Sequence, residues 1–233
     1  MTSLGFDTVL VNNRIYDDDG ILQLFNTLSV YDVRNFIFLS DFDITVNSFS
    51  LESEKIKGFK AFLSKLAPRG IHTYVYYNTF FDKGLVHNKD FNRLYALKKK
   101  SSLFINMPLL SKAVYEELAA DINYMLYRKN AHPLCTGFDM NLETSDSSVC
   151  EHLLSCKGFS FGFELNYIFS KDKRSFLDEI VKNKTFFIPT ITRPIVEYTD
   201  ILHNAEETLK YIGKRDYYQI CASINRCASM FGI

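Results

Sequence analysis

TVLVNNRIYDDDG (residues 8–20) runs from an apolar, strand-like segment through polar residues into an acidic turn that ends in glycine. The consecutive residues Asp17, Asp18 and Asp19 could bind a cation, but this acidic segment lacks the spaced oxygen ligands of a calcium loop. Carboxylates are also favourable at the positive end of a helix dipole. We therefore expect a strand over 7–12, followed by a solvated turn that leads into a helix.

Further apolar runs, each short enough for a buried strand, recur along the chain. They cover residues 35–40, 71–78, 102–107, 133–138, 159–165 and 185–191. Amphipathic segments with helical spacing lie at 51–66 and 111–128, and the last forty residues contain two more. This alternation predicts an α/β fold in which helices cross over a parallel sheet. Because no Pro/Gly-rich linker interrupts it, we expect a single domain over 1–233.

The composition argues against several classes of partner. Lysine plus arginine and aspartate plus glutamate are equal at 27 each, so no net field favours nucleic acid or an anionic membrane. No basic and apolar leader and no long apolar window is present, which predicts a cytoplasmic protein without a membrane span. The five cysteines lack C-x-x-C spacing, which favours free, structural thiols over zinc ligands.

The order of these segments and several strings resemble the manganese-dependent tyrosine phosphatases of bacterial capsule and exopolysaccharide loci. This family belongs to the polymerase and histidinol phosphatase (PHP) superfamily. The strings are DDG (18–20), NFIFLSDF (35–42), SLFINMP (102–108), PLCTGFDMN (133–141), FIPTITR (187–193) and the C-terminal run 207–232, which is similar to the closing pair of helices. The resemblance implies a distorted TIM-like (β/α)7 barrel.

The same strings depart from the family at the positions of its metal ligands. Leu10, Phe42 and Gly137 stand where the family has histidines, and Ile191 stands where it has an aspartate. None of these side chains can donate a lone pair to a metal. Met140 replaces the arginine that would hold phosphate. The resemblance therefore implies a barrel with no metal site and no cofactor. We expect the five histidines to be surface or locally hydrogen-bonded residues, with His132 just before its strand.

Parallel α/β barrels bind ligands at the C-terminal ends of their strands, which we call the mouth. The candidate ligand-binding residues there are Asn12, Asn78, Asn106, Asp139, Glu164 and Arg193. The amides could read donors and acceptors of a ligand, and the arginine could grip a carboxylate or phosphate. The alternative is that these residues cap helices and satisfy strand-end backbone groups. Asp41 and Asp139 are weak candidates for the acid and base pair of a metal-free hydrolase. Arg193 is a further weak candidate for catalysis.

Three hypotheses about function remain. The first is a catalytically inactive PHP-type homologue that binds a protein partner or a small polar ligand at the mouth, in a regulatory role. The second is an active, metal-independent hydrolase, whose turnover would fail on Asp139→Asn or Arg193→Ala. The third is a structural or assembly protein, which would show an exposed apolar patch and a defined oligomer.

Overall fold

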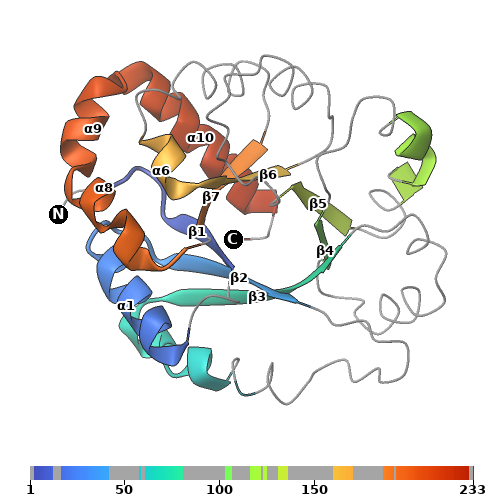
Figure 1. The fold of residues 1–233 in the computed structure, drawn as a ribbon, viewed down its shortest axis with the longest axis horizontal. Helices are drawn as coiled ribbons and strands as arrows, with labels where there is room; N and C mark the ends of the chain where they lie inside the picture. Colours follow the sequence, from blue (N-terminus) through green and yellow to red (C-terminus); the bar gives the residue numbers. More distant parts are fainter. Residues whose placement is uncertain are drawn as a thin grey trace.

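The described strands and helices form a mixed α/β fold (Figure 1). The computed structural model describes residues 3–12, 17–41, 58, 61–80, 103–106, 116–121, 123–124, 131–135, 160–169, 186–191, 193–230 and 233. Most of the predicted helix 51–66 and part of the predicted helix 111–128 lie outside these residues. Their described parts are helical at 61–64 and 116–121, and Leu63 and Leu118 are buried, as the predicted apolar faces require.

Each of the seven apolar runs contains a strand. The strands are β1 (Thr8–Asn12), β2 (Asn35–Asp41), β3 (His72–Phe80), β4 (Leu103–Asn106), β5 (Ala131–Cys135), β6 (Ser160–Glu164) and β7 (Phe186–Ile191). Each strand pairs with the next in parallel, and β1 also pairs with β7. The order β1 to β7 therefore closes into a barrel. The predicted α/β fold with a parallel sheet is confirmed.

Strand β5 begins two residues before the segment predicted for it. Its first residue, Ala131, pairs with Leu103, and His132 pairs with Phe104. The expectation that His132 precedes its strand is therefore wrong. Apolar periodicity marks the interior of a strand but not its first residues, which here are fixed by the pairing with β4.

The helices of the described residues fall into two groups. Two precede β7 in the chain: α1 (Asp18–Ser29) lies between β1 and β2, and α6 (Leu165–Ile168) directly follows β6. Three follow β7: α8 (Thr199–His203), α9 (Ala205–Tyr211) and α10 (Lys214–Met230). There are also two 3-10 turns, η2 (Ala67–Arg69) and η4 (Ile195–Tyr198), besides the helical residues 61–64 and 116–121. None of these helices combines the length and apolar character needed to cross a membrane.

The acidic turn after β1 leads into α1, as predicted. Asp17 is the N-cap, and its Oδ1 accepts a hydrogen bond from the backbone N–H of Gly20 at 2.7 Å. Asp18 and Asp19 occupy the first turn, where the helix dipole favours negative charge. The aspartates thus start a helix.

Helix α1 covers the outer face of the first strands. The Phe25 ring meets the rings of Phe36 and Phe38 edge-on, with centroids 4.6 Å and 6.1 Å apart. Because successive strand residues face opposite sides, Ile37 lies on the side that the ring of strands encloses. Its register partner in β1 is Leu10, which therefore shares that enclosed face.

Helix α10 reaches this enclosed face with its C-terminal half. Cys227 is fully buried in a cluster with Leu10, Ile37 and Ile188, and Ile233 packs against the same cluster. In Figure 1 the end of α10 and the C-terminus lie near the centre of the ring of strands. The last helix therefore contributes to the core of the barrel as well as to its outer layer.

The N-terminal half of α10 holds the segment before β1. The carbonyl oxygen of Leu4 accepts hydrogen bonds from the Tyr217 hydroxyl and from Cys221 Sγ, the latter at 3.6 Å. Gly5 follows in the left-handed region at φ 74°, and a Cβ placed on it would lie 2.8 Å from Cys221 Sγ. We call Leu4, Gly5, Tyr217 and Cys221 the N-terminal clamp.

A matched pair of glycine substitutions tests the close contact in this clamp. Gly70 has nearly the same φ of 71°, but a Cβ there meets no atom within 4 Å. We expect Gly70→Ala to lower the free energy of unfolding by roughly 1–2 kcal/mol, the cost of a left-handed alanine. Gly5→Ala should cost about 1–3 kcal/mol more, because the added methyl also overpacks the contact. Urea denaturation measures both, and equal losses would contradict the close contact at Gly5.

The clamp also predicts how stability depends on pH. Burial raises the pKa of the Cys221 thiol from 9.0 to about 11. The pKa of the Tyr217 hydroxyl is also raised, mainly by burial and to a smaller extent by the neighbouring Cys221. Raised folded-state pKa values mean that the folded protein holds these protons more tightly. The resulting stabilisation is complete below the unfolded-state pKa and is lost as the pH rises through the folded-state value.

We therefore expect the free energy of unfolding to fall as the pH is raised from 9 toward 11. The double variant Tyr217→Phe/Cys221→Ala should show a shallower fall, because it lacks both buried protons. Denaturation midpoints at a series of alkaline pH values provide the measurement. Parallel pH profiles of the two proteins would mean that these groups do not carry the effect.

Candidate functional site

Five of the residues singled out in the sequence lie at or near the C-terminal ends of their strands. Four are the last residue of a strand, and the fifth lies two residues before the end of β3. They are Asn12, Asp41, Asn106, Glu164 and, in β3, Asn78. The structure thus brings residues from five strands to the mouth edge of the barrel.

Strand register relates the positions in β2, β3 and β4. Asp41 and Asn78 are direct partners, and Asn78 is also the partner of Phe104. Asn106 follows Phe104 by two residues, and Asp41 follows Ile37 by four. Because the side-chain period of a strand is two, the backbone positions of Asp41, Asn78 and Asn106 share the face of Ile37, which is the enclosed face.

The positions in β1 and β6 share this face as well. Asn12 follows Leu10 by two residues. Thr190 of β7 is the register partner of Leu10 on one side and of Glu164 on the other. All five candidate positions therefore have the phase of the barrel interior, at the edge where ligands of parallel barrels bind.

The register separates Ile191 from Leu10. Ile191 pairs with Val11 and so lies on the face opposite to Leu10. The resemblance assigned both residues to ligand positions of one metal cluster, but their positions are not in phase. A sequence alignment without gaps cannot detect such an offset, because shifting a strand by one residue exchanges its faces.

Glu164 is the candidate whose side chain is described in most detail. It is 8% exposed, and its Oε2 accepts a hydrogen bond from the hydroxyl of Tyr198, which is itself 1% exposed. Tyr198 ends η4, the turn that follows β7. The bond therefore joins the end of β6 to the segment after β7. One carboxylate oxygen of Glu164 therefore takes part in a contact that holds the fold together.

Arg193 lies just beyond the end of β7. Its Nη1 is 3.6 Å from Oε2 of Glu197 in η4, and the two side chains are 45% and 47% exposed. An ion pair this exposed stabilises a protein by about 1 kcal/mol or less. The guanidinium thus remains accessible to solvent at the mouth edge. The remaining candidate, Asp139, lies outside the described residues, as does any geometry of an Asp41 and Asp139 pair.

The donor set of the described residues does not fit a polynuclear metal site. These residues contain no group of three or more histidine, cysteine or acidic side chains placed to hold a metal ion. Leu10, which the resemblance aligns with a histidine, is fully buried among apolar side chains. His72 and His203 are exposed, as expected of surface histidines. Cys221 and Cys227 are buried and form no disulfide, in agreement with the structural interpretation for these two thiols.

Sequence reasoning missed a cavity at the opposite edge of the barrel. It has a volume of about 410 Å³ and lies between the residues before and at the start of β1, the start of β2 and the last turns of α10. Its polar lining residues are Ser3, Asp7, Thr8, Asp32, Asn35 and Asn225. No local sequence motif could predict this cavity, because its lining residues come from both ends of the chain.

No protein-family model matches the chain, and no curated protein matches it.

The bond between Tyr198 and Glu164 makes a prediction about stability. Tyr198→Phe removes the donor and leaves a buried carboxylate oxygen without it, which should cost about 1–3 kcal/mol of unfolding free energy. Tyr218→Phe is the matched control, because Tyr218 is 71% exposed. We expect the control to change stability by less than about 0.5 kcal/mol. Equal denaturation midpoints for the two variants would show that the bond contributes nothing.

Proposed function

We propose that this chain is a catalytically inactive homologue of the PHP-type phosphatases. In this proposal residues 1–233 form one distorted TIM-like (β/α)7 barrel, and its mouth binds a small polar ligand or a protein partner in a regulatory role. The observation that carries the proposal is the buried apolar environment of Leu10, at a position where the resemblance expects a metal-binding histidine.

Metal-dependent phosphoryl chemistry needs several imidazoles and carboxylates that converge on ions able to activate water. In the described residues of the mouth, the strand ends supply amides and two acidic residues instead. Asparagine is a neutral ligand and provides little of the field that such a site requires. Amides and carboxylates do suit the recognition of a polar ligand, because together they offer both donors and acceptors. These features support binding over catalysis.

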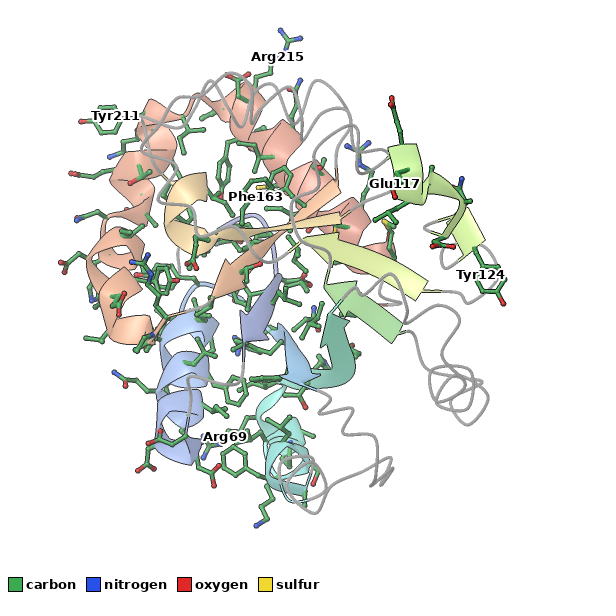
Figure 2. The ribbon with its side chains drawn as sticks, turned by 45° about the vertical axis from the view of Figure 1, so that its right-hand side comes forward. Arg69, Glu117, Tyr124, Phe163, Tyr211 and Arg215 are labelled. Atoms are coloured by element: carbon green, nitrogen blue, oxygen red, sulfur yellow. The ribbon has the colours of Figure 1, made fainter. Side chains whose placement is uncertain are left out.

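The assembly hypothesis receives less support. The large apolar or aromatic side chains exposed among the described residues are Val30, Tyr124, Val196, Tyr211, Tyr218 and Met230. Tyr124 and Tyr211 lie on opposite sides of the molecule (Figure 2). These two tyrosines therefore do not belong to one contiguous patch, which an interface requires.

Calorimetric titration of the metal-stripped protein with Mn²⁺ tests the proposal. An active member of the phosphatase family, stripped in the same way, serves as the positive control. We expect no heat of binding at micromolar Mn²⁺, because Leu10, Phe42 and Gly137 have no lone pair to donate and the asparagines are neutral ligands. Tight, stoichiometric binding would overturn the proposal and restore a metal-dependent hydrolase as the leading hypothesis.

Turnover of p-nitrophenyl phosphate separates the silent barrel from a metal-independent hydrolase. We expect hydrolysis no faster than in buffer, both for the natural chain and for Arg193→Ala. A rate above buffer that Arg193→Ala or Asp139→Asn abolishes would favour the hydrolase.

A further inference from the structure

The cavity at the N-terminal edge of the barrel is a second polar site, on the edge opposite to the mouth. Thr8 and Asn35 are the first residues of β1 and β2 and are register partners. Asn225 and Ala228 of α10 line the other side. A volume of about 410 Å³ falls within the range of roughly 300–1,000 Å³ that small-molecule sites occupy.

A chain of hydrogen bonds orients the polar groups of this cavity. Asn35 Nδ2 donates to Thr8 Oγ1 at 3.4 Å, and Thr8 Oγ1 donates to Asp7 Oδ1 at 2.8 Å. Thr8 is fully buried, so its hydroxyl proton is committed to Asp7. These two hydrogen bonds use donor groups of Asn35 and Thr8. Two acceptor atoms, Oδ1 of Asn35 and the second carboxylate oxygen of Asp7, take no part in them and can face a ligand.

The backbone holds this chain in place. The carbonyl oxygen of Asp7 accepts hydrogen bonds from the backbone N–H groups of Arg34 and Asn35, both at 2.9 Å. The backbone of Asp7 is therefore held, and the Thr8 hydroxyl orients its carboxylate, which lowers the entropic cost of binding.

The formal charge of the cavity is negative. Asp7 and Asp32 are both in the lining, and the described lining residues include no lysine, arginine or histidine. Arg34 lies outside the lining, with its Nη2 3.7 Å from Asp32 Oδ1. Phe6 and Ala228 provide an apolar part of the wall. The lining thus combines two carboxylates, further acceptors and a small apolar surface.

We propose that this cavity binds a small organic cation with several N–H donors and a short apolar chain, such as a diamine or a guanidino compound. The ammonium or guanidinium groups match the fixed acceptors and the two carboxylates, and the methylene groups match the apolar wall. The site is separate from the mouth and does not depend on the function proposed for it.

Titration with putrescine, agmatine and 1,4-butanediol tests this proposal by calorimetry. Butanediol has nearly the length of putrescine but carries no charge and fewer donors. We expect putrescine or agmatine to bind one to one, and butanediol to give no heat. Binding should weaken as salt is added, because both carboxylates lie in a cavity open to solvent.

Two charge-removing variants and one control locate the site. Asp7→Asn and Asp32→Asn should each weaken binding about tenfold or more, the order expected for a charge-assisted hydrogen bond. Asn tolerates the left-handed conformation that Asp32 adopts at φ 63°, so the fold is retained. Glu207→Gln removes an equal charge from the exposed surface of α9 and should leave the affinity unchanged.

Three outcomes would overturn the proposal. They are no binding of either cation up to millimolar concentration, equal binding of butanediol, or equal weakening by Glu207→Gln and the cavity variants. The Mn²⁺ titration of the mouth is unaffected by any of them, so the two proposals fail independently.

Discussion

Strand β1 is hydrogen-bonded to β2 on one side and to β7 on the other, and this double pairing sets the geometry of the rest of the barrel. The three central residues of β1, Val9, Leu10 and Val11, are apolar and fully buried, and they occupy both faces of the strand. A strand buried on both faces is typical of a closed parallel sheet covered by helices. Once β1 is placed, the register fixes the phase of every strand and therefore which polar residues reach the enclosed face.

Much of the fold could be predicted from the sequence, because each buried strand is a short apolar run with a recognisable boundary. The start of α1 could also be predicted from the acidic turn, because carboxylates interact favourably with the positive end of the helix dipole. The start of β5 and the phase of Ile191 could not be predicted, because both depend on pairing with a strand that is distant in sequence. The hydrogen bond between Tyr198 and Glu164 could not be predicted either, because the two residues are 34 positions apart in the sequence.

The candidate site shows the same division. Strand-end position alone correctly brought Asn12, Asn78, Asn106 and Glu164 to one edge. What each does depends on contacts that sequence does not encode locally, as with the tyrosine hydroxyl that occupies one oxygen of Glu164. The cavity at the other edge required residues from both ends of the chain, so no motif could have pointed to it. The described residues thus place polar side chains at both edges of the barrel, with different chemistry at each edge.

The N-terminal clamp bears on how the protein is made. The bond between Tyr217 and Leu4 spans 213 residues, and the pairing of β1 with β7 also joins early and late segments. Contacts this distant in sequence close large loops and are associated with slow folding. During synthesis β1 must wait for β7 and α10 to emerge, and until then it has no partner on one side. Until then the β1 edge that later pairs with β7 has unpaired backbone groups, and such edges are prone to aggregation.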